Sequence, residues 1–283
     1  MSETHAAMMP LSPIGVVSLL GGWYDDLRLR QPVLAAFTFL MLAAMAPTLL
    51  AMALDARTFN GVNVWIKPFK FELSTAVHMA TLALFWPYLD SRFRQGRVLR
   101  AAAWIIAAIF VFEVGYIAYR ASLAEASHFN DTTPTAALLY AAMGVAIVVV
   151  MAITVWIGVQ LLRSQEGGIS PTLRLSIGLG LILGTLLGTA SGVAMSQHYS
   201  HWVGGTASDA GGLPLFGWSR AGGDLRVAHF VGLHAMQGLP FIGWLTQRSS
   251  SGRVWVIAAA LVWVGLSAAV FIQAWQGKPF LPL

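Results

Sequence analysis

The chain has 283 residues, of which 57% are hydrophobic and only 10% are charged, and its mean hydropathy is +0.69. This composition excludes a soluble domain and predicts a polytopic membrane protein. The formal net charge is +5, but no basic block occurs, so we expect loop charges rather than a nucleic-acid partner. Because the sequence has no cysteine, disulfides, CxxCH haem attachment, iron–sulfur clusters and thiol catalysis are excluded. A bound metal would need His, Met or oxygen ligands.

Long apolar runs predict an all-α transmembrane bundle of about seven spans. The runs are separated by short segments rich in charge, Gly and Pro, and they cover residues 31–54, 69–89, 98–120, 134–162, 173–197, 225–247 and 253–276. Residues 1–30 begin with an acidic stretch and lack a small-residue cleavage site, so we interpret them as an interfacial segment rather than a signal peptide. Residues 31–283 are predicted to form a single transmembrane domain.

Lysine and arginine are biased toward one set of loops, and this bias predicts the orientation in the membrane. The richer set is predicted to be cytoplasmic and contains Arg28, Arg30, Arg92, Arg94, Arg97, Arg100, Arg163, Arg174, Arg248 and Arg253. The opposite set is smaller and contains Arg57, Lys67, Lys70, Arg120, Arg220, Arg226 and Lys278. We therefore expect the N-terminus inside and the C-terminus outside.

Ionisable side chains interrupt three of the predicted spans at a similar depth. At about 1.5 Å per residue, His78, Glu113 and His234 lie roughly 10–15 Å from the outer side, and His229 lies nearer to it. Burying such groups in hydrocarbon is costly, so they predict a functional site that opens outward. The alternative is a structural role, in which Glu113 forms a buried ion pair and each histidine bonds a backbone carbonyl.

Each of these spans carries a polar stripe, with members three or four residues apart, that leads outward from this level. The stripes consist of Lys70, Ser74, His78 and Thr81 in the second span, Glu113, Tyr116 and Arg120 in the third, and His234 and Gln237 in the sixth. His229 is about 140° around the helix from His234, so the two are not predicted to bind one ion as a simple pair. The predicted catalytic or proton-handling residues are Glu113, Tyr116, Arg120 and Lys70.

Small residues recur at every fourth position of the fifth span. The ridge contains Ser176, Gly180, Gly184, Gly188, Gly192 and Ser196. Such a ridge is typical of close packing against a neighbouring helix, which is the preferred interpretation. The alternative is a flat face for a planar cofactor or quinone at Gly184 and Gly188. The glycine-rich segment 198–224 is predicted to be either a lid over the site or a mobile loop with its aromatic residues at the lipid interface.

Three stretches of the chain carry a family resemblance, and they read NVWIKPFKFELS, SHFNDTTP and LPLFGWSRAGGDLRVAHFVGLHAMQGLP. Together with the seven-span layout, they resemble an uncharacterised family of bacterial seven-helix integral membrane proteins. The likeness covers most of residues 60–247. It implies a location in the bacterial cytoplasmic (inner) membrane, and it implies neither an activity nor a set of active-site residues.

Two classes of function stay open, and with them the question of whether the protein is an enzyme. In the preferred class, an oxidoreductase or electron-transfer protein, His78 and His234 ligate a haem b or another metal. The other predicted cofactor-binding residues are His229, Gln237, Gly184 and Gly188. The alternative is a proton-coupled transporter, channel or sensor that uses the same residues as a proton relay or solute pocket. Besides the lipid bilayer, the expected partners are a quinone or a small solute.

Overall fold

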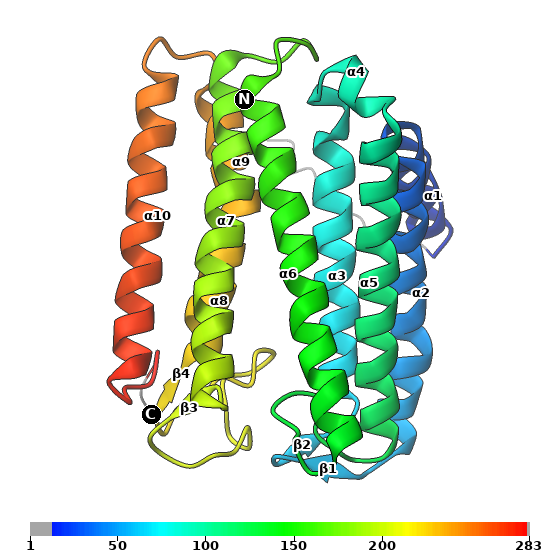
Figure 1. Cartoon of the computed structure of the whole chain (residues 1–283), viewed down its shortest axis with the longest axis vertical. Helices are drawn as coiled ribbons and strands as arrows, with labels where there is room; N and C mark the ends of the chain where they lie inside the picture. Colours follow the sequence, from blue (N-terminus) through cyan, green and yellow to red (C-terminus); the bar gives the residue numbers. More distant parts are fainter. Residues whose placement is uncertain (1–12, 282–283) are drawn as a thin grey trace, which may run out of the picture.

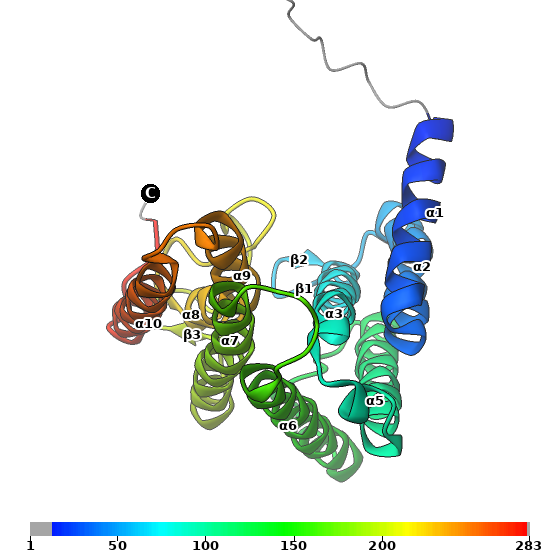
Figure 2. The same cartoon turned by 90° about the horizontal axis from the view of Figure 1, so that it is seen from above.

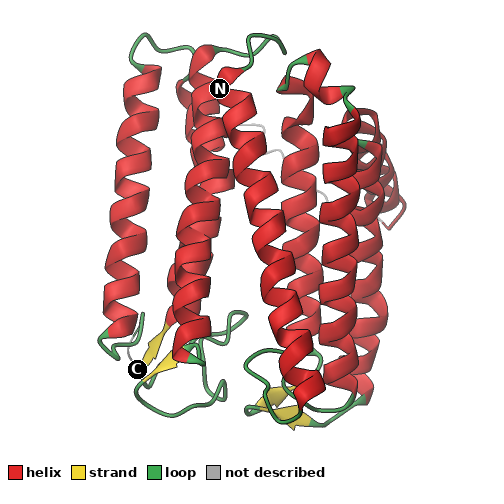
Figure 3. Cartoon of the chain, in the orientation of Figure 1, coloured by secondary structure: helices red, strands yellow, loops and turns green. Residues whose placement is uncertain are grey.

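The computed structural model describes residues 13–281 as a bundle of helices with two small sheets at one end (Figures 1 and 3). The helices are α1 (Pro13–Arg30), α2 (Pro32–Leu54), α3 (Ile66–Phe85), α4 (Ser91–Arg94), α5 (Arg97–Ser122), α6 (Pro134–Arg163), α7 (Pro171–His198), α8 (Leu225–Leu233), α9 (Ala235–Thr246) and α10 (Gly252–Trp275), with the 3₁₀ turn η1 (Trp86–Tyr88) after α3. Strand β1 (Thr58–Phe59) pairs antiparallel with β2 (Val62–Asn63), and β3 (Trp202–Val203) with β4 (Gly223–Asp224). The predicted all-α class is confirmed.

Among the described residues, five helices are long and apolar enough to cross a membrane, namely α2, α5, α6, α7 and α10. Many of their large apolar side chains point away from the bundle; Leu138 and Leu261, for example, are each 69% exposed. Such apolar surfaces are unfavourable in water and expected in lipid, so the chain is a membrane protein. Two further columns, α3 and the α8–α9 pair, run beside these helices (Figure 1). That they also cross the membrane stays a prediction.

Proline and small polar residues fix where the long helices begin. Pro134 and Pro171 occupy the first position of α6 and α7, where a missing N–H has no helical partner. The preceding side chains, Thr133 and Ser170, each accept a hydrogen bond from the N–H three residues on. These local signals explain why the observed starts of α6 and α7 lie close to the predicted ones.

The helices form two groups, with α6 between them (Figure 2). The first group contains α1, α2, α3 and α5, and the second contains α7, α8, α9 and α10. Helix α6 packs along α7 and also contacts α5. Helix α1 lies across the bundle rather than along it (Figures 1 and 2), as expected for an interfacial segment. Residues 1–12 of the predicted segment 1–30 lie outside the described part of the chain.

The chain passes from one end of the bundle to the other along each column, and we name the ends by their content (Figure 1). The sheet end carries both small sheets, the loop 126–133 and a long loop, residues 199–224. The arginine end carries α4 and the connections 164–170 and 247–251. It corresponds to the side on which the sequence places most of its arginines.

The predicted span 225–247 is not one continuous helix, because it breaks at His234 into α8 and α9. Pro240 lies in α9, lacks an N–H and crowds the carbonyl four residues before it. Trp263 on α10 donates its indole N–H to the carbonyl oxygen of Val231 at 2.8 Å. In a continuous helix that carbonyl would accept from the N–H four residues on. A neighbouring helix therefore stabilises the break, which places His234 at the junction.

Candidate functional site

Helix α3 and the second group of helices are bridged by two polar contacts. Near the sheet end, Lys70 donates to the carbonyl oxygen of Phe216 in the long loop at 2.7 Å. Deeper in the bundle, Gln237 on α9 donates to Thr81 Oγ1 at 2.9 Å. Residues 70 and 81 are about 16 Å apart along a helix. The contacts thus mark the two ends of a stretch of α3 that faces α8 and α9 (Figure 2).

Between these contacts the surface of α3 is not covered. Ser74 and Val77 lie on the same helical face as Lys70 and Thr81, yet both are exposed, Val77 by 40%. On the opposite wall His234 and Gln237 are half-buried. We call the uncovered face of α3, together with the residues opposite it, the interhelical cleft. Its lining residues are Lys70, Ser74, Val77, Thr81, His234 and Gln237.

Two histidines, His229 in α8 and His234 at the junction of α8 and α9, each form a hydrogen bond from Nδ1 to a backbone carbonyl oxygen. His234 Nδ1 lies 2.8 Å from the oxygen of Phe230, and His229 Nδ1 lies 2.8 Å from the oxygen of Gly188 on α7. Because a carbonyl oxygen only accepts, the neutral rings carry their proton on Nδ1. Each ring therefore keeps Nε2 as an atom that can accept a proton or bind a metal.

His78 is turned away from the cleft, toward α6. Its Nε2 lies 3.2 Å from Thr154 Oγ1, and that hydroxyl donates its own proton to the oxygen of Val150 at 2.9 Å. His78 Nε2 is therefore the donor to Thr154, and the ring packs edge-on against Phe110. The predicted polar stripe of α3 is divided, since His78 and His234 have separate polar partners. The bond to Thr154 occupies the nitrogen that haem ligation would use.

The four predicted catalytic residues are not assembled into one group. Arg120 ends α5 and pairs with Glu125 at 2.8 Å, because the chain turns back directly after the helix. Its guanidinium carbon lies 5.9 Å from the ring centre of Tyr116. Glu113 is 5% exposed and belongs to none of the ion pairs in residues 13–281. The structural alternative, an ion pair of Glu113 with Arg120, Lys70 or Lys67, is therefore not formed among the described residues, and Lys70 belongs to the cleft.

The small-residue ridge of α7 packs directly against α8 and α9. A methyl group on Gly184 would lie 2.9 Å from both the oxygen of Leu233 and the nitrogen of Met236, and one on Gly188 would overlap the Leu233 side chain. Backbone and side chains of the neighbouring column thus occupy the face that a planar cofactor would need. Helix packing accounts for the ridge, and the expected cofactor contacts of Gly184 and Gly188 are corrected accordingly.

Helix α8 begins, at the sheet end, with an ion-pair network that the sequence analysis did not predict. Asp224 caps α8, is 1% exposed, and accepts from the N–H groups of Ser219 and Arg226. The guanidinium of Arg226 lies between two carboxylates, 2.6 Å from Asp224 and 2.7 Å from Asp209. It also donates to the oxygen of Gly217 at 2.8 Å. The Asp-x-Arg pattern at the start of the helix is the sequence signal that could have indicated part of this network.

The long loop is fastened to the first group of helices as well. In the turn between β1 and β2, the oxygen of Asn60 accepts from the N–H of Asp209 at 2.8 Å and from the hydroxyl of Ser208 at 3.2 Å. Asn60 and Gly61 both have positive φ, 53° and 83°, as a tight two-residue hairpin turn requires. With the Lys70–Phe216 contact, these bonds hold the loop across the sheet end of the cleft, in the position of the predicted lid.

A lysine and an imidazole lie beside this network. Lys67 is exposed in the first turn of α3, within electrostatic reach of Arg226 and Asp209. His128 lies in the loop 126–133, and its Nδ1 is 3.1 Å from the hydroxyl of Ser127. Burial, and then the positive charge of Lys67, holds the pKa of His128 well below its usual value. His128 is therefore neutral at pH 7.

A second imidazole of the sheet end belongs to the long loop. His201 Nε2 lies 3.5 Å from Asp209 Oδ1, and the ring centre lies 3.9 Å from that of Trp202. Burial lowers the pKa of His201, the contact with Asp209 raises it, and the charge of Arg226 lowers it, with a net lowering. His201 and His229 both lie close enough to His128 to influence it electrostatically. The sheet end thus places His128 near Lys67 and His201 beside Asp209.

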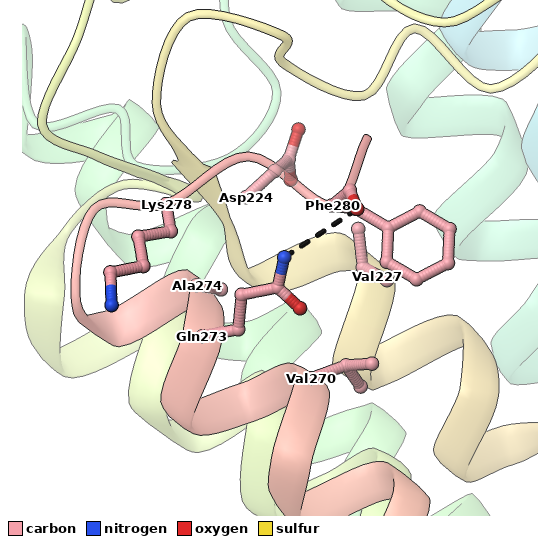
Figure 4. A pocket seen from close by; sticks show the side chains of 7 residues that line it. All are labelled: Asp224, Val227, Val270, Gln273, Ala274, Lys278 and Phe280. Atoms are coloured by element: carbon pink, nitrogen blue, oxygen red, sulfur yellow. Dashed lines mark hydrogen bonds between the residues drawn. The ribbon is translucent and has the colours of Figure 1, made fainter. Parts of the chain in front are cut away.

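Two surface hollows lie outside the interhelical cleft. One is too narrow for a water molecule, and its lining residues are Asp224, Val227, Val270, Gln273, Ala274, Lys278 and Phe280 (Figure 4). The other, of about 240 Å³, lies at the arginine end, and its lining residues are Trp244, Leu245, Gln247 and Arg248. Neither contains a residue predicted for the site, so the interhelical cleft is the candidate site.

Comparisons of the chain with protein-family models, with curated proteins and with solved structures found no match. The family resemblance of the three stretches stays a prediction. Within residues 13–281, no group of three or more His, Asp or Glu side chains is arranged to hold a metal ion. The proposed function therefore rests on the interhelical cleft.

Proposed function

We propose that the protein is a membrane carrier that admits a small polar solute from the sheet end into the interhelical cleft and couples its movement to a proton. The observation that supports this proposal is the exposure of Ser74 and Val77 between the two contacts that join α3 to the second group of helices. These two contacts are hydrogen bonds, and they lie beside an apolar cluster that contains residues of both groups, among them Met79, Leu181 and Met236. We propose that one group of helices moves against the other by breaking the two hydrogen bonds, as carriers require.

His234 is the residue proposed to carry the proton. Its Nε2 is left as an acceptor by the bond from Nδ1 to Phe230, and it stands one helical turn from Gln237 on the cleft wall. A charged imidazole in an empty, poorly hydrated cleft is unfavourable, whereas water or a polar solute stabilises the charge. Proton binding and solute binding therefore favour each other, and this coupling is reciprocal.

The proposed location is the bacterial cytoplasmic membrane, with the sheet end facing outward. The arginine end then faces the cytoplasm, which agrees with the positive-inside rule. This orientation puts the N-terminus inside and the C-terminus outside, and it makes α3 and the α8–α9 pair two of seven spans. The solute would enter under the long loop, whose contacts with Asn60 and Lys70 would open first.

Site-directed labelling tests whether the cleft holds water. The natural chain has no cysteine, so Ser74→Cys and Val77→Cys can each be labelled without background by a charged, membrane-impermeant thiol reagent added from outside. Leu261→Cys is the matched control, because Leu261 is 69% exposed on α10 and is expected to face lipid. We expect both cleft cysteines to react and the control to stay unlabelled, since the reactive thiolate requires water. Equal, slow reaction at all three positions would refute the cleft.

Proton coupling is tested in proteoliposomes with an internal pH dye while amino acids, sugars and carboxylates are added outside in turn. A solute that moves with a proton shifts the internal pH, and His234→Gln is expected to abolish the shift. His198→Gln changes an exposed histidine at the end of α7 and serves as control. If His234→Gln transports like the natural protein, His234 is not the proton carrier.

A metal-binding or haem-binding function is the second candidate, and one observation favours it. His229 and His234 both donate Nδ1–H to a carbonyl and leave Nε2 free, an arrangement common among metal ligands. A haem held between His78 and His234 fits less well, because His78 donates Nε2–H to Thr154. Absorption spectra of the oxidised and dithionite-reduced protein, with elemental analysis, decide the matter. Reduced bands or a metal that are lost in His234→Ala would favour this candidate over the carrier.

A further inference from the structure

We propose that the solute of the interhelical cleft carries an oxyanion, a carboxylate or a phosphate, and that Lys67 binds this group at the sheet end. The inference rests on the proposed carrier function and names the class of its solute. Two features of the sheet end support it, namely an excess of positive charge and buried polar groups that lack a protein partner.

Among five charged side chains at the sheet end of the cleft, Lys67, Lys70, Arg226, Asp209 and Asp224, the cations outnumber the carboxylates by one. Arg226 is shared by Asp209 and Asp224 at 2.7 and 2.6 Å, so these three side chains leave one negative charge in excess. Lys70 and Lys67 add two positive charges, which leaves a net charge of +1. Lys70 is held by the oxygen of Phe216 at 2.7 Å.

Lys67 is the cation of this group whose charge is available. It is exposed, and it takes part in none of the ion pairs in the described part of the chain. It lies close enough to Arg226, Asp209 and His128 for their charges to interact. A lysine ammonium on its flexible stem is a point charge that suits a carboxylate or phosphate oxygen. The free charge of Lys67 therefore selects for an anion.

The long loop above the cleft contains three buried nitrogen atoms that lack a hydrogen-bond partner. They are the indole nitrogen of Trp202 and Nε of Arg220, whose N–H groups can only donate, and Nε2 of His201, which lies 3.5 Å from Asp209 Oδ1. Buried polar groups in folded proteins are nearly always hydrogen-bonded, so unpaired ones need an explanation. An oxyanion is an acceptor, and its oxygen atoms would satisfy the Trp202 N–H. The N–H groups that lack an acceptor and the Lys67 ammonium that lacks an ion pair would therefore bind the same kind of ligand, an oxyanion.

The electrostatic character of the neighbouring imidazoles agrees with this assignment. The pKa of His128 is lowered by burial first, and then by the positive charge of Lys67. The potential around His128 is thus positive, and a cleft lined by one sign of charge attracts solutes of the opposite sign. A cationic solute would be repelled at this mouth, and a neutral sugar would gain nothing from Lys67.

Ligand-induced thermal stabilisation of the full-length, detergent-purified protein tests the inference. The eleven tryptophans report unfolding, and the probes are sodium acetate, sodium succinate and sodium phosphate against sodium chloride at equal ionic strength. The variants are Lys67→Met, the charge-conserving Lys67→Arg, and Lys278→Met as matched control. Lys278 is an exposed lysine at the same end that extends away from Asp224 (Figure 4). Its loss changes the net charge equally but leaves the cleft intact.

We expect at least one of the three oxyanions to raise the Tm of the natural protein in a saturable way. Lys67→Met should weaken the half-saturating concentration about tenfold or more, because a hydrogen bond to a charged group is lost. Lys67→Arg should retain most of the affinity, and Lys278→Met should bind as the natural protein does. If none of the three oxyanions raises the Tm, or if Lys67→Met and Lys278→Met behave alike, the inference is overturned.

The labelling of Ser74→Cys separates this inference from the proposed function. Labelling without oxyanion binding would leave the water-filled cleft in place and remove only the assigned solute class. Oxyanion binding without labelling would leave an anion site at the sheet end and remove the carrier function.

Discussion

The two ends of the bundle contain similar polar residues but use them in different ways. At the arginine end, polar groups from separate connections satisfy one another. Asp90 Oδ1 accepts from the hydroxyl of Ser164 at 2.6 Å, and Glu166 Oε2 accepts from the N–H of Ser91 at 2.7 Å. The hydrogen bond from Ser164 lowers the pKa of Asp90. These bonds tie the turn after η1 to the connection between α6 and α7 and leave little polar capacity for a ligand.

At the sheet end, several polar groups lack a partner, and several residues have a strained backbone. Lys67 lacks an ion pair among the described residues, and buried nitrogens of the long loop lack hydrogen-bond partners. Non-glycine residues with positive φ also gather there, and they are Asn60, Ala124, Phe129, Tyr199 and Leu215. Strain of this kind clusters at ligand sites. The arginine end therefore holds the bundle together, whereas polar groups at the sheet end remain able to bind a ligand.

The largest effect on stability is expected at Asp224, whose hydrogen bonds and ion pair stabilise the sheet end. Asp224→Ala removes a buried carboxylate that accepts from Ser219 and pairs with Arg226. Because this leaves a partly buried charge undercompensated, we expect a loss of about 3 kcal/mol of unfolding free energy. Denaturant unfolding in detergent measures it, with Asp25→Ala as control for the exposed Asp25–Arg28 pair. Equal stability of the two variants would contradict the assigned role of Asp224.

The next largest effect tests the packing between the ends. In Gly184→Ala the new methyl group would press on the backbone of α8 and α9, so we expect a loss of about 1–3 kcal/mol. Gly144→Ala is the matched control, because a methyl group on Gly144 of α6 has nothing within 4 Å. The same unfolding measurement compares them. If Gly184→Ala is as stable as Gly144→Ala, the ridge of α7 does not serve helix packing.

Much of the fold was predictable from the sequence, since hydropathy and capping residues act locally. The runs 31–54 and 134–162 correspond closely to α2 and α6. The break at His234 was not predicted, because Pro240 alone does not specify it. The hydrogen bond that stabilises it comes from Trp263, a residue in the next helix. A contact between helices leaves no periodic signal in either one.

The candidate site was predicted in part. Helical spacing predicted a polar stripe with Lys70 on one helix and a polar face with His234 and Gln237 on another, and the structure places all three residues beside the cleft. His78 was placed on the same stripe, yet a step of four residues rotates the side chain by about 40°. That rotation is enough to direct His78 to Thr154 on α6. The pairing of Arg226 with Asp209 joins α8 to an irregular loop, which no periodicity foretells.

A smaller loss of stability is expected from a substitution at the arginine end. Ser164→Ala removes the hydrogen bond to Asp90, so we expect a loss of about 1 kcal/mol of unfolding free energy. We expect no change in oxyanion binding, because the bond lies at the end opposite Lys67. Lys67→Met should show the reverse pattern, with weakened binding and little change in stability. A loss of oxyanion binding in Ser164→Ala would mean that the two ends are not functionally distinct.

The smallest effect concerns acid, which should act on the sheet end first. The pKa of His128 is well below its usual value in the folded protein, whereas in the unfolded chain it is about 6.5. Between these values the unfolded chain binds more protons, so stability falls as the pH falls from 7.0 to 5.5, by on the order of 1 kcal/mol. At the arginine end the pKa of Asp90 is also lowered, but a carboxylate titrates nearer pH 4 and stays charged in this range.

Unfolding free energies of the natural protein and of His128→Asn at pH 7.0 and 5.5 test this prediction. Asparagine can keep a hydrogen bond to Ser127 but does not titrate, so the variant should lose less stability in acid than the natural protein. His201→Asn should remove a further part of the pH dependence, because the pKa of His201 is lowered too. Identical pH dependence in the natural protein and His128→Asn would show that His128 is not what makes the sheet end sensitive to acid.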